Sequence, residues 1–470
     1  MDATELAYAG IARQAEVIAD GEVSSRELVE LYLGRIARLD ARLNAFRVVW
    51  GDRALEDADE ADRRRAGGER AHLLGVPVAV KDVSDVAGDV TGFGTGGFER
   101  PAPADSEIVA RLRVAGAVPI GKLNLPELAI YGITESRTWG ATRNPWDPGR
   151  TPGGSSGGSG AAVAAGLVGA ATGSDGAGSI RIPAANCGIF GLKPQRGRIS
   201  LAPLSEHWHG MSVNGCLTRT VRDTALFLDA TAGAAPGDAH SPPVPDRPFL
   251  EAAAEVPGRL RIAFSSRPPR LIVPAIVDDS VREAVDGTAR LLRSLRHDVR
   301  EQDPDYGLIA NGVAALYLRG IHDDVRAVPR PELLESRTRG FGRLGALVTP
   351  GALRRARAAI PKHAARVNRV FEQHDVLMVP TVGRPPVEIA RWEGRGALRI
   401  LLGMSRTYPF TGAWNYTGQP AAAVPAGFTA DGLPLSVQLV GRPNDEATLL
   451  SLAAQIEAER PWADRLPPLD

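Results

Sequence analysis

Lysine is scarce in this chain. Of 55 basic residues, 51 are arginine and only four are lysine: Lys81, Lys122, Lys193 and Lys362. Such a bias leaves lysine either as a random remnant or where arginine cannot replace it. Buried lysine can lose its proton and act as a base, whereas arginine cannot. We interpret Lys362, in a basic helical stretch, as a remnant, and Lys81, which ends an apolar run in GVPVAVKDV, as a candidate for chemistry.

Cysteine and net charge are lacking as well. The only two cysteines, Cys187 and Cys216, do not lie in a C-x-x-C or Cys/His metal-binding spacing. This excludes a disulfide framework and predicts reduced, structural thiols. We expect no metal and no cofactor. The 55 basic residues are balanced by 55 acidic ones, which argues against general binding to nucleic acid or to a membrane.

Long hydrophobic runs are also missing. The N-terminal MDATELAYAG lacks the basic and then apolar layout of a signal peptide, and the longest weakly polar run, 161–173, is short and rich in glycine and alanine. We therefore expect a soluble, cytoplasmic protein.

Helix-like and strand-like segments alternate along the chain, which predicts an α/β fold with a central mixed sheet. Two helices are expected within 2–45, the second opened by a capping box of Ser24 and Glu27. A strand at 76–80 ends beside Lys81. Further helices are expected at 104–116, 159–166, 218–234, 279–295 and 445–459, and further strands at 117–121, 168–172, 260–264, 297–300, 375–380, 421–425 and 435–440. The helical, arginine-rich stretch 306–371 forms either a lid over a site or a solvated face.

The segment from Pro152 to Gly197 holds two serine clusters embedded in glycine. Glycine inside a helix or strand costs about 0.5–1 kcal/mol relative to alanine, so this composition predicts turns that present hydroxyls and backbone N–H groups to a ligand. Ser155 falls at a loop-to-helix junction, and Ser179, in DGAGS, follows a strand end.

A serine that attacks an amide carbonyl needs a base, donors for the oxyanion and an acid for the leaving amine. The eight histidines fall mostly in loops and in arginine-rich or proline-rich stretches, and Ser179 lacks a G-x-S-x-G context. Lys81 is therefore the titratable candidate for the base.

Three segments resemble the hallmarks of the amidase signature family: VAVKD around Lys81, GGSSGGSGAAVAAG at 153–166, and GSDGAGSIRIPAANCGIFGLKP at 173–194. The resemblance extends over nearly the whole chain. It implies a single amidase domain over residues 1–470, with a helical, cap-like or variable subregion at about 300–375. It also implies the amidase-signature fold, whose central mixed, mostly parallel twisted sheet is covered by helices on both faces.

The resemblance implies hydrolysis of a small-molecule amide to acid plus ammonia or amine. Ser179 would be the nucleophile that forms the acyl-enzyme, Ser155 the bridging serine and Lys81 the base. The Gly154–Ser155 peptide would be cis. Neither nucleic acid nor a membrane is an expected partner, and a homodimer is left open.

The resemblance further assigns the oxyanion hole to backbone N–H groups of Gly176, Ala177, Gly178 and Ser179. Ser156, Asp175 and Arg181 would support the two turns. Gly176 stands where the family commonly has Thr or Ile, and Ala177 where it has Gly. If Ala177 needed a positive φ, its methyl would strain the loop by about 1–2 kcal/mol; at negative φ the change is harmless.

The acyl pocket is expected to be lined by variable segments at 131–135, 205–210 and 401–414. Within them Tyr131, Trp208 and Trp414 either favour an apolar or aromatic acyl group or simply fill the core. Two other functions stay open: the A subunit of a glutamine-dependent tRNA amidotransferase, and a repurposed or weakly active biosynthetic member of the family.

Overall fold

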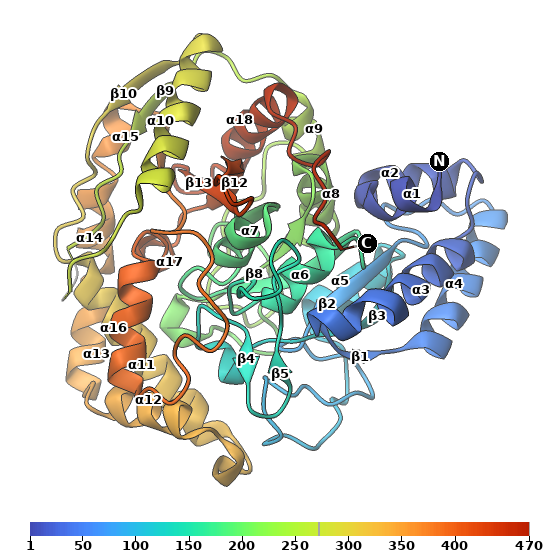
Figure 1. Cartoon of the computed structure of the whole chain (residues 1–470), viewed down its shortest axis with the longest axis horizontal. Helices are drawn as coiled ribbons and strands as arrows, with labels where there is room; N and C mark the ends of the chain where they lie inside the picture. Colours follow the sequence, from blue (N-terminus) through green and yellow to red (C-terminus); the bar gives the residue numbers. More distant parts are fainter. Residues whose placement is uncertain (271–272, 470) are drawn as a thin grey trace.

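A computed structural model describes residues 1–270 and 273–469, and these residues form an eleven-stranded sheet surrounded by helices (Figure 1). In space the strands follow the order β1-β3-β2-β6-β8-β7-β12-β13-β11-β9-β10. Their bounds are β1 Phe46–Val49, β2 Pro77–Lys81, β3 Val118–Leu123, β6 Ala170–Asp175, β7 Phe190–Lys193, β8 Val213–Thr218, β9 Arg261–Phe264, β10 Asp298–Glu301, β11 Val376–Pro380, β12 Ala421–Phe428 and β13 Pro434–Val440. Two short strands, β4 Glu135–Ser136 and β5 Gly140–Ala141, pair separately.

Parallel pairing is confined to two blocks of the large sheet. Strand β2 pairs in parallel with β3 and β6, and β9 with β10 and β11. The strands between β6 and β11 pair antiparallel, as does the edge strand β1. The predicted α/β class with a mixed central sheet is confirmed, and the parallel share among the described strands is smaller than expected.

Helices cover the sheet and extend it at both ends. Figure 1 shows the first four helices at one end and the region from α10 to α16 at the opposite end. The bounds are α1 Ala3–Tyr8, α2 Gly10–Ala19, α3 Ser25–Leu43, α4 Gly51–Ala66, α5 Glu107–Val114, α6 Gly157–Ala164, α7 Arg181–Cys187, α8 Val221–Thr231, α9 Phe249–Ala254, α10 Asp279–Ser294, α11 Ile309–Ala327, α12 Ser336–Ala346, α13 Pro350–Ala358, α14 Ile360–Val367, α15 Val370–Gln373, α16 Ala397–Thr407, α17 Gly412–Thr417 and α18 Glu446–Glu459. Short 3₁₀ turns are η1 Glu127–Ala129, η2 Trp208–Gly210 and η3 Pro331–Leu333.

Local sequence signals explain most of these boundaries. The capping box predicted at Ser24 and Glu27 opens α3, and the Asp445 side chain caps α18. The first predicted helix is instead two, because the chain turns at Ala9 between α1 and α2. Strands β1, β7 and β8 were not expected. Strands β7 (FGLK) and β8 (VNGCLT) each contain a glycine, a residue depleted in strands, whereas the equally buried β2 (PVAVK) and β11 (VLMVP) are rich in valine.

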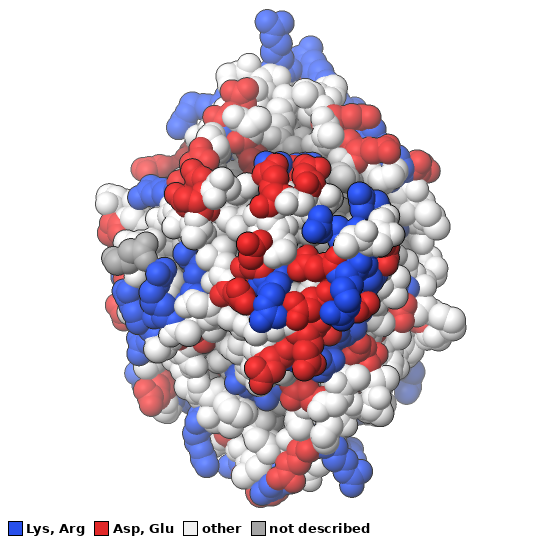
Figure 2. All heavy atoms as spheres, turned by 90° about the vertical axis from the view of Figure 1, so that its right-hand side faces the viewer, with Lys and Arg blue, Asp and Glu red and all other residues white. Residues whose placement is uncertain are grey.

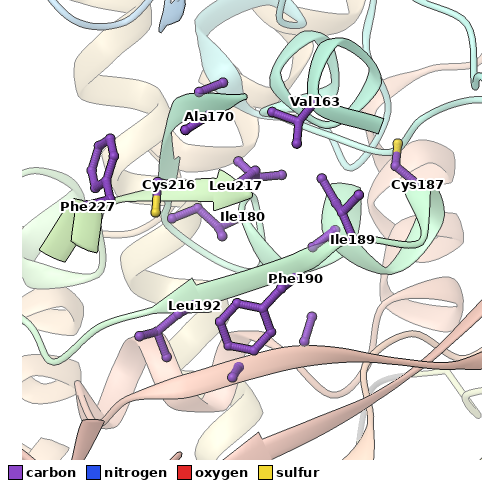
Figure 3. Packing of buried hydrophobic residues seen from close by; sticks show 14 of the residues in the cluster. Val163, Ala170, Ile180, Cys187, Ile189, Phe190, Leu192, Cys216, Leu217 and Phe227 are labelled. Carbon is purple, nitrogen blue, oxygen red and sulfur yellow. The ribbon is translucent and has the colours of Figure 1, made fainter. Parts of the chain in front are cut away.

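The two cysteines belong to the apolar core, as predicted. Figure 3 shows Cys187 and Cys216 among side chains that include Ile189 and Leu217. Both thiols are free, and burial raises the pKa of Cys216 to about 12. A thiol held in its protonated form is a poor nucleophile, so these residues are structural.

The charged surface is mixed. On the face shown in Figure 2, acidic and basic side chains are interspersed. Among the surface ion pairs, Arg26 of α3 lies 2.7 Å from Asp59 of α4. Within the described part of the chain, no helix is long and apolar enough to cross a membrane.

Candidate active site

The predicted catalytic residues come from elements that end at one edge of the sheet. Lys81 is the last residue of β2 and Asp175 the last of β6. These strands run parallel, with Ala79 opposite Ala171, so their carboxyl ends meet. Ser155 precedes α6, and Ser179 lies in the turn between β6 and α7.

Lys81 is fully buried at this edge. Its Nζ lies 2.8 Å from Ser155 Oγ and 2.8 Å from Ser174 Oγ, while its backbone N–H donates to Thr172 Oγ1 at 2.8 Å. Burial lowers the pKa of Lys81 to about 7, although the negative charge of Asp175 opposes the shift. Near neutral pH this amine is therefore available in its unprotonated form.

The other three lysines differ in burial and in their contacts. Lys122 and Lys193 are also fully buried, whereas Lys362 is exposed. Lys122 Nζ lies 3.4 Å from Asp82 Oδ1, and Lys193 Nζ donates to the Pro194 carbonyl at 2.7 Å. Each buried lysine thus occupies a site with oxygen partners, and Lys81 alone of the three bonds to Ser155.

The turn that carries Ser155 is hydrogen-bonded to the turn that carries Ser179. The Gly154–Ser155 peptide is cis, as the resemblance implies. Ser156 donates its backbone N–H to the Ser179 carbonyl at 3.2 Å and its hydroxyl to the Ser174 carbonyl at 3.3 Å. Ser155 and Ser179 line one cavity of about 350 Å³. Among the hydrogen bonds of the described residues, none joins their two hydroxyls.

The second turn is tied down by a buried ion pair. Arg181 Nη2 lies 2.9 Å from Asp175 Oδ1 and both side chains are fully buried; the same guanidinium donates to Asn415 Oδ1 and Gln438 Oε1, each at 2.6 Å. Arg181 holds the pKa of Asp175 well below its usual range, against the opposing effect of burial. Sequence reasoning missed Asn415 and Gln438, which lie far away in the chain and carry no local signal.

One predicted oxyanion donor needs correction. The Gly178 N–H already donates to Asp175 Oδ1 at 2.6 Å, because this carboxylate lies inside the turn. Ala177 does not have a positive φ, so its methyl adds no backbone strain. A Cβ on Gly176 would lie 2.6 Å from Trp208 Cε3. The Trp208 ring therefore takes the space that a larger residue at position 176 would need.

Two cavities meet at Ser179. The apolar cavity, of about 160 Å³, is lined by Tyr131, Ala177, Val313, Tyr317, Met404 and others, and has no Asp, Glu, Lys, Arg or His among its described lining residues. The second cavity is the 350 Å³ cavity of Ser155 and Ser174; we call it the acidic cavity because Asp85 and Asp324 line it. Ser179 and Trp208 line both.

The three aromatic residues considered for the acyl pocket do not all line a cavity. Tyr131 and Trp208 line the apolar cavity. For Trp414 the structure favours the core alternative: its ring is fully buried and packs against Tyr306 at 6.0 Å between centroids, while its neighbours Gly412 and Ala413 line the cavity. The sequence also missed Ser174, the second partner of Lys81. Helix α11, within the stretch for which a lid was one of two alternatives, lines the apolar cavity through Val313 and Tyr317.

Known proteins are similar to this chain in sequence and in fold. The Amidase family model matches residues 27–450. The protein AmiB2 of Mycobacterium tuberculosis is 51% identical over 99% of this chain and 99% of its own, and the 6-aminohexanoate-cyclic-dimer hydrolase of Pseudomonas sp. is 36% identical over 97% and 96%. A solved structure of 6-aminohexanoate cyclic dimer hydrolase superposes with a TM-score of 0.89 at 34% identity, covering 98% of this chain and 99% of that one.

The chain therefore belongs to the amidase family, in the amidase-signature group. It is an enzyme that hydrolyses amide C–N bonds. These findings favour a hydrolase over the A subunit of a tRNA amidotransferase, the first alternative left open above.

Proposed function

We propose that this enzyme cleaves small-molecule amides through an acyl-enzyme on Ser179, with Ser155 as the bridging serine and Lys81 as the base. The observation that carries the proposal is the 2.8 Å contact between the fully buried Lys81 amine and Ser155 Oγ. An unprotonated amine at this position can accept the Ser155 proton as Ser155 accepts the proton of Ser179.

The proton relay then runs in both directions. Ser179 Oγ attacks the amide carbon, and its proton passes through Ser155 to Lys81. When the C–N bond breaks, the proton returns through Ser155 to the leaving nitrogen. Water then enters, gives a proton to the same relay and releases the acid from Ser179.

The oxyanion would be stabilised by the backbone N–H groups of Gly176, Ala177 and Ser179. Gly178 is left out because its N–H is engaged by Asp175. Removal of one such donor typically costs about 2.7–4 kcal/mol in the transition state. Asp175 and Arg181 would support the hole by fixing the turn, and Ser156 by tying it to the first serine turn.

The acyl group is assigned to the apolar cavity. Its lining by Tyr131 and Trp208 and its lack of charged side chains in the described residues favour an aliphatic or aromatic acyl group. Helix α11 contributes Val313 and Tyr317 to the same wall, which supports the lid interpretation of the 300–375 region.

Hydrolysis of an amide panel, from acetamide to aromatic amides, tests this function. We expect Ser179→Ala to lose at least about 10³-fold in kcat, as is typical of a catalytic nucleophile, and the control Ser294→Ala, on the exposed end of α10, to retain wild-type rates. Glutaminase activity without hydrolysis of any other amide would contradict the proposal.

A further inference from the structure

We propose that the preferred substrate is a secondary amide whose amine half carries an ammonium group, held in the acidic cavity while the acyl group occupies the apolar cavity. This inference rests on the proposed function. It adds a direction for the substrate and a charge for its leaving group.

The orientation of the substrate follows from the position of Ser155, the proposed proton donor to the leaving nitrogen. The leaving nitrogen must receive its proton from Ser155. Ser155 and Ser174 line the acidic cavity, and neither lines the apolar one. A leaving amine in the apolar cavity would lie on the far side of Ser179 from its proton donor. The amine half therefore belongs in the acidic cavity and the acyl half opposite it.

The lining of the oxyanion turn agrees with this direction. Gly176 borders the acidic cavity, Ala177 borders the apolar cavity, and Ser179 borders both. A carbonyl bound at their N–H groups would thus lie at the boundary between the two cavities, with one substituent in each. Trp208, shared by both linings, forms the partition.

The positive charge proposed for the leaving group follows from the ionisable residues that line the acidic cavity. They are Asp85, Asp324 and His207; within the described residues no lysine or arginine lines the cavity, although arginine makes up 51 positions of the chain. Asp85 accepts a hydrogen bond from the neutral Thr91 hydroxyl at 2.6 Å. Asp324 accepts one from Trp208 Nε1 at 2.7 Å and lies 3.2 Å from His207 Nε2.

The remaining walls suit an alkyl spacer. Phe93, Phe98 and Leu204 line the same cavity, so a short methylene chain would contact apolar surface before its charged end reaches a carboxylate. An alkyldiamine acylated on one nitrogen has this layout. A primary amide would leave the cavity empty, and an amine half that ends in a carboxylate would meet like charges.

Three matched amides of butanoic acid test the inference: N-(4-aminobutyl)butanamide, the neutral N-pentylbutanamide, and the anionic 5-(butanoylamino)pentanoate. We expect kcat/KM to fall in that order, by about tenfold or more from the first to the last. Asp324→Asn and, independently, Asp85→Asn should reduce the difference in kcat/KM between the first and the last amide. The control Asp323→Asn should not, because Asp323 pairs with Arg319 and His209 and does not line the cavity.

Acylation by 4-nitrophenyl butanoate separates this inference from the proposed function, because its leaving group needs neither a proton nor a positive charge. If wild type forms no acyl-enzyme from this ester, the proposed function fails. If the ester acylates Ser179 but the three amides are cleaved equally, or the anionic one best, the present inference is overturned while the mechanism stands. Should one aspartate variant not fold, the other and the wild-type substrate order still decide.

Discussion

At the scale of single residues, the proposed mechanism depends on the protonation state of Lys81. The amine is surrounded by Ser155 and Ser174 hydroxyls and is fully buried, so its charged form is penalised. Its sequence context and the rarity of lysine make it a candidate for the base. Ser174 could not be identified in the same way, since serine is ordinary in a glycine-rich turn and only the fold brings its hydroxyl to the amine.

The pH dependence of kcat/KM reports this residue. Because the pKa of Lys81 is lowered to about 7 and the base must be unprotonated, the rate should rise about tenfold per pH unit below 7 and level off above it. Lys81→Arg should lose at least about 10³-fold at every pH, since arginine keeps its proton. Lys362→Arg, at the exposed lysine, is the matched control and should follow wild type. A flat profile from pH 6 to 9 would argue against the proposed base.

At the scale of elements, the turn between β6 and α7 is shaped by its neighbours as much as by its own sequence. Asp175 and Arg181 hold it from within, and Trp208 of η2 lies against Gly176. The sequence raised Ala177 as the doubtful residue. The structure instead places the steric constraint at Gly176, one position earlier. The local glycine pattern could not predict it, because it arises from contact with a distant tryptophan.

Exchanging small residues in this turn tests that view. Gly176→Ala would place a methyl 2.6 Å from the Trp208 ring, so we expect the proposed oxyanion donors to shift and kcat to fall by about 10- to 100-fold, as small misplacements do. Ala177→Gly should stay within about threefold of wild type, because Ala177 has no positive φ to relieve. Steady-state kinetics with thermal unfolding distinguish a displaced turn from an unfolded enzyme. Equal losses in both variants would refute the assigned constraint.

At the scale of the whole molecule, motif-bearing segments were predictable and long-range packing was not. The sequence pattern located β2, β9 and β11 near their observed bounds. It missed β7 and β8, which contain glycine in place of a continuous apolar run. The segment 401–414, predicted to line the acyl pocket, contributes to the apolar cavity, but Met404 lines the cavity and Trp414 lies in the core. Which side each residue takes depends on the path of the whole chain around α11 and α17.

The covalent adduct formed with a fluorophosphonate tests the central claim most directly, because this reagent reacts with an activated serine and leaves a mass that peptide mapping can locate. We predict one adduct per chain, on Ser179, absent in Ser179→Ala and formed at least about 100-fold more slowly in Lys81→Ala. An adduct on Ser155, Ser174 or any other serine of the wild-type enzyme, or undiminished labelling of Ser179→Ala, would contradict the assignment of the nucleophile.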